Sequence, residues 1–318
     1  MLHHNFMIKG IAKLLYLFLW KKYKYIIFFS LITKKCIFLQ KKLIYYNMFK
    51  IFDLHNDYIL KLKNYRKKRY VEKNNLMSNN IISAVWTSEF NSYESMQEIK
   101  KARDYVNLHR HLLLAVEDLH FLNKDNLDNF LLLRPAYAGL TWNNCNALAG
   151  GAHEYGNLTR FGRTTIRKME ANGIKVDTAH LNEESFMDIS KITTKPIFCS
   201  HTAFFGVHHD SRNLKDYQIK MIIDTGGIVG LCLVSDFING SKRCSIDDVA
   251  IHIDYFACKF GISSLALGTD FFGTKHLPKN TKDYEDLTSG LSRKLTKMGY
   301  TEKSLNKIFY ENAEKFFA

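Results

Sequence analysis

The chain has 318 residues, of which 46% are hydrophobic and 24% are charged. This balance excludes a disordered or fibrous protein and is ordinary for a globular protein with a sizeable core. Residues 1–48 contain nine lysines and no acidic residue, so they supply +9 of the formal net charge of +14. The rest of the chain carries only the remaining +5, and we expect no binding of nucleic acid.

The first 47 residues differ in composition from the rest of the chain. Their apolar runs, 14–20 and 25–33, are separated by lysines, and neither approaches the roughly 20 residues that span a bilayer. We interpret them as a basic extension outside the fold, upstream of a true start at Met48. The alternative is a segment that anchors the protein to a membrane or lies at its surface. A single domain is then expected over residues 48–318.

Short apolar runs predict eight strands after the extension. Continuous rather than alternating apolar runs are typical of parallel strands that are buried on both faces. The predicted strands are 51–54, 81–86, 112–116, 136–141, 174–179, 196–200, 228–233 and 264–268.

Helical patterns fill the intervals between the predicted strands. Residues 163–172 end before Gly173, and residues 214–224 have isoleucines at helical spacing. Ser245 begins a third helix with a capping-box pattern, and Gly261 ends it. Eight alternating strands and helices predict an α/β (β/α)8 TIM barrel; a doubly wound sheet is the alternative.

Polar residues stand at several predicted strand ends, where a TIM barrel builds its active site. His55 and Asp57 follow the first strand two residues apart, so their side chains point to the same side. Glu117 follows the third strand, and Asp270 follows the last one. His180 and His201 directly follow two successive predicted strands. Imidazole and carboxylate groups are common ligands of zinc-like ions, so the set predicts a metal-dependent hydrolase.

The ordered motifs resemble the membrane (renal) dipeptidase family, in a bacterial-type variant, from about Phe49 to the C-terminus. The motifs that carry the resemblance are Phe-Asp-Leu-His-Asn-Asp (52–57), Ala-Val-Glu-Asp (115–118), Gly-Leu-Thr-Trp-Asn (139–143), Val-Asp-Thr-Ala-His (176–180), Ser-His-Thr-Ala (200–203), Ser-Arg-Asn-Leu (211–214) and Gly-Thr-Asp-Phe (268–271). The resemblance implies a TIM barrel of the metal-dependent hydrolase type that cleaves dipeptides with two divalent metal ions, expected to be zinc.

The resemblance also implies a role for each matched residue. His55 and Asp57 would bind the first metal, His180 and His201 the second, and Glu117 would bridge the two as part of the catalytic centre. Asp270 would be the catalytic acid and base next to the bridging water. Arg212 would bind the free carboxylate of the dipeptide through its planar, permanently charged guanidinium.

Trp142 is the main departure from the family pattern. The best-known members have Leu-Thr-His where this chain has Leu-Thr-Trp142, so a histidine that polarises the substrate is missing and Trp142 is expected to contact the substrate instead. His153 is a candidate replacement for that histidine. The alternatives to a dipeptidase are a hydrolase of another amide or lactam on the same barrel, or a non-catalytic metal-binding relative.

Six cysteines without a paired spacing predict reduced thiols and favour a reducing compartment. We therefore expect a cytoplasmic enzyme; the alternative is membrane anchoring through residues 1–47. Its partner would be a dipeptide substrate, and a homodimer is left open.

Overall fold

The computed structural model describes residues 49–61 and 79–318, which all belong to one compact unit over Phe49–Ala318. The predictions for residues 1–47 lie outside the described residues. Eight parallel strands form one sheet. They are β1 (Phe52–Asn56), β2 (Asn80–Trp86), β3 (Leu112–Glu117), β4 (Tyr137–Gly139), β5 (Lys175–Asp177), β6 (Cys199–Thr202), β7 (Val229–Leu231) and β8 (Leu265–Leu267).

The sheet closes on itself as a TIM barrel, which confirms the predicted fold. Its strand order is β5-β4-β3-β2-β1-β8-β7-β6, and β1 pairs with β8 in parallel. The two ends of that order, β5 and β6, are joined by a single bridge between Asp177 and Phe198. The barrel therefore has a weakly paired seam between β5 and β6.

Two buried carboxylates reinforce the barrel where backbone pairing is sparse. Asp177 on β5 accepts hydrogen bonds from the backbone N–H (2.8 Å) and the hydroxyl (2.6 Å) of Ser200 on β6. Asp53 on β1 accepts the same two bonds, at 2.8 and 2.6 Å, from Thr269 just beyond β8. Each pair is a carboxylate clamp between neighbouring strands, and charge-assisted bonds of this kind are stronger than neutral ones.

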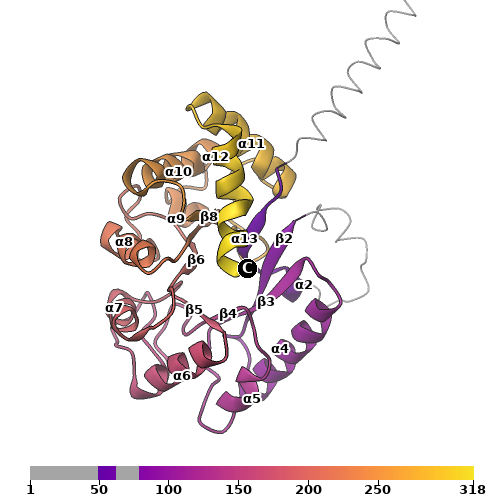
Figure 1. Cartoon of the computed structure of the whole chain (residues 1–318), viewed down its shortest axis with the longest axis vertical. Helices are drawn as coiled ribbons and strands as arrows, with labels where there is room; N and C mark the ends of the chain where they lie inside the picture. The colour runs from indigo at the N-terminus through magenta and orange to yellow at the C-terminus, as the bar shows by residue number, and fades with distance from the viewer. Residues whose placement is uncertain (1–48, 62–78) are drawn as a thin grey trace, which may run out of the picture. The chain divides into compact units, whose positions relative to one another are not determined.

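Helices surround the strands, as Figure 1 shows for α4 to α8 and α10. The helices are α2 (Tyr58–Lys61), α4 (Ser92–Asn107), α5 (Leu127–Leu131), α6 (Arg160–Ala171), α7 (Glu183–Ile192), α8 (Asp216–Asp224), α9 (Ser235–Ile238), α10 (Ile246–Phe260), α11 (Tyr284–Lys297), α12 (Glu302–Asn306), the π-helical turn η2 (Lys307–Glu311) and α13 (Asn312–Phe317). The predicted start of α10 is confirmed, because Ser245 and Asp248 form a capping box. Gly261 ends it with φ of 75°, which favours glycine.

The C-terminal helix α13 closes the end of the barrel opposite the predicted site. In Figure 1 it crosses the centre of the strands. The Phe317 ring lies 5.9 Å from Phe52 and 5.6 Å from Phe198, between ring centroids. Both of these residues stand at the N-terminal ends of strands. The barrel interior below the site is thus filled with aromatic side chains.

The sixth strand begins later than predicted. Residues 196–200 were expected to form it, but β6 runs over Cys199–Thr202. Pro196 has no backbone N–H, and the N–H of Ile197 donates to the hydroxyl of Thr225 instead of a strand. His201 therefore lies within β6 and not after it. No helix in the described part of the chain is long and apolar enough to cross a membrane.

Candidate metal centre

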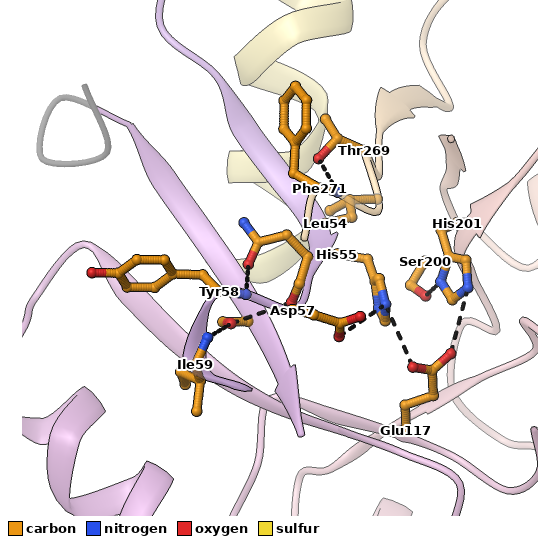
Figure 2. A network of polar contacts seen from close by, with 12 residues as sticks. Leu54, His55, Asp57, Tyr58, Ile59, Glu117, Ser200, His201, Thr269 and Phe271 are labelled. Atoms are coloured by element: carbon orange, nitrogen blue, oxygen red, sulfur yellow. Dashed lines mark hydrogen bonds and ion pairs between the residues drawn. The ribbon is translucent and has the colours of Figure 1, made fainter. Parts of the chain in front are cut away.

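Side chains from three strands meet at the C-terminal end of the barrel (Figure 2). His55 is the fourth residue of β1, Glu117 the last of β3 and His201 the third of β6. All three side chains are buried. Each of them offers a ligand atom within 4.8 Å of the other two. The structure thus brings together residues that are 62 and 84 positions apart in the sequence.

Glu117 lies between the histidines. Its Oε1 is 2.7 Å from Nε2 of His180 and 3.6 Å from Nε2 of His201. Its Oε2 is 3.8 Å from Nε2 of His55. The two carboxylate oxygens therefore face different histidines, which is the arrangement that a bridging ligand requires.

A second group consists of His55, Asp57 and Asp270, whose ligand atoms also lie within 4.8 Å of one another. Nε2 of His55 is 4.0 Å from Oδ1 of Asp57. Gly273 makes room for both carboxylates. A Cβ atom there would lie 2.1 Å from Oδ1 of Asp270 and 2.2 Å from Oδ2 of Asp57, so both carboxylates would have to shift.

The donor atoms fit divalent cations. Nε2 of His55 and Oδ1 of Asp57 are buried and have no hydrogen-bond partner in the described part of the chain. Buried polar atoms without partners are costly, and a bound cation removes that cost. Histidine and carboxylate donors of this kind suit zinc and similar ions.

The δ nitrogens of His55 and His180 indicate which tautomer each imidazole adopts. The Tyr137 hydroxyl donates to the carbonyl of Leu54 (3.0 Å), so it accepts the bond from Nδ1 of His55 at 2.8 Å. Nδ1 of His180 lies 2.8 Å from Oδ1 of Asn143, an oxygen that only accepts. Both imidazoles therefore carry the proton on Nδ1 and present the lone pair of Nε2 to the site.

The Nε2 atoms of His180 and His201 lie close together. Nε2 of His180 is 2.9 Å from Nε2 of His201. Burial lowers the pKa of both imidazoles well below the ordinary value, and the nearby Arg212 charge lowers it further. Burial also lowers the pKa of His55 to about 3. All three imidazoles are neutral at pH 7, which is the form that binds metal.

Burial has the opposite effect on the carboxyl groups. It raises the pKa of Asp57 and of Glu117, and neighbouring carboxylates raise both further. Burial raises the pKa of Asp270 to about 7, although Arg212 opposes this shift. A carboxyl group with a pKa near neutrality can both accept and return a proton at working pH.

Arg212 lies against the imidazole of His201. Its side chain is 4% exposed, and Nη2 is 3.2 Å from Nε2 of His201. The guanidinium carbon lies 5.2 Å from the ring centre of Phe237. Its Nε is buried without a hydrogen-bond partner among the described residues. Arg212 also lines a cavity of about 390 Å³, together with His153 and Asn182.

Trp142 forms part of the wall next to His180. The two rings lie 6.0 Å apart, and Trp86, the last residue of β2, lies 5.3 Å from Trp142 at a steep angle. Trp142 is 36% exposed, so part of its surface is open to solvent. The position predicted for a substrate contact is therefore accessible.

Two site residues have a left-handed backbone conformation. The φ angle is 66° at His180 and 57° at Asp270. Non-glycine residues adopt this conformation rarely, although histidine and aspartate do so more readily than most. Such residues often occur at functional sites, where the surrounding structure holds them in place.

A sequence profile of the membrane dipeptidase family, peptidase family M19, matches residues 81–318. The chain belongs to this family. An uncharacterized protein of the pqqA 5′ region of Klebsiella pneumoniae is 30% identical over 186 residues, which are 55% of this chain and 68% of that protein. The dipeptidase aclJ of Aspergillus oryzae is 30% identical over 190 residues, 56% of this chain and 45% of that protein. The matched region thus spans about half the length of the Aspergillus relative.

Solved structures share the fold. The metallopeptidase of Rhodobacter sphaeroides, solved with a phosphinate mimic of the dipeptide L-Ala-D-Ala, superposes with a TM-score of 0.77 and 19% identity. The superposition covers 85% of this chain and 99% of that one. An amidohydrolase of Pseudomonas aeruginosa has a TM-score of 0.72, with 20% identity and coverage of 85% and 95%.

Sequence reasoning placed the converging residues but missed those that support them. Tyr137 and Asn143, which orient His55 and His180, were not predicted to have a role. Neither was Gly273, which lies beside Asp57 and Asp270. A tyrosine in a buried strand or a glycine after a strand end is common, so the sequence offered no specific signal for them.

Proposed function

We propose that this protein hydrolyses dipeptides at a two-metal centre. His55 and Asp57 would hold the first cation, His180 and His201 would hold the second, and Glu117 would be a ligand shared by the two. The observation that supports this most strongly is the convergence of buried imidazole lone pairs on one glutamate. Two divalent cations in this site, which we expect to be zinc, would act as Lewis acids and lower the pKa of a water molecule toward neutrality.

Asp270 moves the proton in this scheme. Its carboxylate lies beside His55 and Asp57, so it would accept a proton from the attacking water and pass it to the leaving amine. Its backbone N–H donates to the carbonyl of His55 at 3.0 Å, which holds the loop after β8 against the site.

Arg212 selects substrate length. It is a buried cation whose Nε has no hydrogen-bond partner among residues 49–61 and 79–318, so a substrate carboxylate would satisfy it. A dipeptide would place its terminal carboxylate there while its single peptide bond lies at the metal centre. A longer peptide would not bring its carboxylate to the same place.

Hydrolysis of a small panel of dipeptides tests this proposal. The panel contains L-Ala-L-Ala, L-Ala-D-Ala, a tripeptide and an amidated dipeptide, because the Rhodobacter peptidase was solved with a mimic of L-Ala-D-Ala. We expect fast cleavage of the free dipeptides, much slower cleavage of the amidated dipeptide and none of the tripeptide, with loss of activity in a chelator and recovery with zinc. Testing both the full chain and a variant that begins at Met48 examines the proposed domain boundary.

Trp142 favours one second candidate, hydrolysis of another amide or lactam. The indole stands where a polarising histidine is usual, and it presents an apolar face to the site. Protein that holds two zinc ions but cleaves no dipeptide would favour this alternative or a non-catalytic relative. A homodimer, a cytoplasmic location and membrane anchoring through residues 1–47 stay predictions from the sequence.

A further inference from the structure

A chain of three polar side chains runs from β5 to the metal centre. Oδ2 of Asp177 accepts the hydroxyl proton of Ser200 at 2.6 Å. Oγ of Ser200 lies 2.9 Å from Nδ1 of His201, as Figure 2 shows for the last two residues. All three side chains are buried.

The direction of these bonds is fixed by proton counting. A serine hydroxyl has one proton, and Ser200 gives it to Asp177. Its oxygen can then only accept from Nδ1 of His201. His201 therefore carries its proton on Nδ1. Its Nε2 lies 3.6 Å from Oε1 of Glu117, and its lone pair can also accept from Nη2 of Arg212 at 3.2 Å, which favours the same tautomer.

We propose that Asp177, acting through Ser200, is a positioning residue that fixes the tautomer of His201 and thereby the affinity of the second metal position. This inference rests on the proposed metal centre but not on the identity of the substrate. Supporting partners of metal-binding histidines commonly have this effect.

The substitution Asp177→Asn reverses the proton order. Oδ1 of Asp177 accepts from the N–H of both Ala179 (3.1 Å) and Ser200 (2.8 Å), so the asparagine oxygen would keep that position. The asparagine NH₂ would then face the Ser200 hydroxyl and donate to it. Ser200 would direct its own proton to Nδ1 of His201, which would move the imidazole proton to Nε2 and block the ligand atom.

Asp53 provides a matched control. It is a buried carboxylate that binds the N–H and hydroxyl of Thr269 at the same distances, 2.8 and 2.6 Å. Oγ1 of Thr269 accepts from the backbone N–H of Phe271 at 3.2 Å, and no histidine of the described ranges is hydrogen-bonded to it. Asp53 also accepts bonds from the Tyr284 hydroxyl (2.6 Å) and from the backbone N–H of His55 (3.3 Å), so Asp53→Asn disturbs at least as many buried bonds as Asp177→Asn. Its carboxylate contacts neither Ser200 nor His201 in the described part of the chain, so the tautomer of His201 should not change.

The experiment is a zinc titration of the full chain against a chromogenic chelator, with and without each substitution. We expect Asp177→Asn to weaken the second equivalent of zinc by about 10- to 100-fold. In Asp53→Asn the second equivalent should bind as in the unsubstituted chain. Unchanged binding in Asp177→Asn, or an equal loss in Asp53→Asn, would overturn the inference.

A nitrogen NMR spectrum of the histidine side chains in the zinc-free protein reports the tautomer directly. The proton of His201 should lie on Nδ1 in the unsubstituted chain and on Nε2 in Asp177→Asn. A proton on Nε2 in the unsubstituted chain would contradict the proposal. If Asp177→Asn does not fold, Ser200→Ala removes the acceptor of the Nδ1 proton, and the second equivalent of zinc should weaken there too.

These readouts are independent of peptide hydrolysis. A chain that binds two zinc ions and shows the predicted tautomer but cleaves no dipeptide would refute the proposed function and leave this inference intact. Normal dipeptide cleavage by the unsubstituted chain, together with unchanged affinity for the second zinc ion in Asp177→Asn, would refute this inference and leave the proposed function intact.

Discussion

Arg212 is a buried cation without a carboxylate within ion-pair distance in the described part of the chain. Burying an unpaired charge is expensive, so proteins retain one where a ligand supplies the opposite charge. The stacking of Arg212 over Phe237 and its contact with His201 fix the guanidinium in place before a ligand arrives. Such preorganisation favours recognition of a carboxylate.

We expect Arg212→Met to raise the KM for L-Ala-L-Ala by about 10- to 100-fold, the value of one charge-assisted hydrogen bond. Turnover of the amidated dipeptide should change little, because it has no carboxylate to lose. Steady-state kinetics on both substrates measure the ratio of kcat/KM for the free dipeptide to kcat/KM for the amidated one. Arg163→Met, which removes a surface ion pair with Asp188, is the control. An unchanged ratio in Arg212→Met would contradict the assignment.

Gly273 leaves the space that the carboxylates of Asp57 and Asp270 occupy. The substitution Gly273→Ala should push Asp57 and Asp270 apart, because its Cβ would overlap both carboxylates. We expect kcat to fall by about 100-fold, since small displacements of reacting groups have effects of this size. Thermal unfolding should change far less than activity. Gly290→Ala in α11, where the nearest atom is a flexible isoleucine side chain at 3.1 Å, should leave kcat unchanged. Full activity in Gly273→Ala would refute the steric argument.

At the scale of secondary structure, the order of strands and helices was predictable because buried parallel strands leave apolar runs in the sequence. The convergence of His55, Glu117 and His201 followed from the rule that a barrel collects its strand ends at one edge. The supporting contacts were not predictable. Whether Tyr137 points into the barrel or away from it depends on strand register, which is set by tertiary packing.

The aromatic closure by α13 is an element of the fold that the sequence did not reveal. Phe317 contacts Phe52, Phe198 and Tyr137, which are far from it in the chain. The cation of Lys175 at the start of β5 also lies over its ring, at 5.6 Å. The helix thereby links the starts of several strands.

Phe317→Ala should lower the free energy of unfolding by about 1–2 kcal/mol, because it removes the ring contacts of a partly buried side chain. Denaturant unfolding measures this change. The KM for dipeptides should stay the same, since the substituted side chain lies at the other end of the barrel. Leu108→Ala, at a side chain that is 81% exposed, should leave stability unchanged. Equal stability of the two variants would show that α13 does not support the barrel.

For the whole molecule, the candidate metal centre brings together residues of β1, β3 and β6 with residues of the loops after β5 and β8. Ligands that bind only the folded state stabilise it by mass action. At zinc concentrations 100-fold above the dissociation constant, the gain is about 2.7 kcal/mol for each site. Metal should therefore be a major source of stability.

Removal of metal with a chelator should lower the Tm by about 5–10 °C for each zinc ion that was saturated to this degree. Calorimetry with and without added zinc measures the shift. In His55→Ala and His201→Ala the increase in Tm that zinc causes should be smaller, because each variant has lost one ligand. A zinc effect of full size in both variants would place the binding elsewhere.

The two carboxylate clamps also differ in the sequence separation between the residues that they join. The bond between Asp177 and Ser200 closes a loop of 23 residues, whereas that between Asp53 and Thr269 closes one of 216. Loop-closure entropy makes the longer closure costlier by about 2 kcal/mol. The join between β1 and β8 is therefore expected to form late during folding and to limit its rate, while the seam between β5 and β6 assembles early from neighbouring segments.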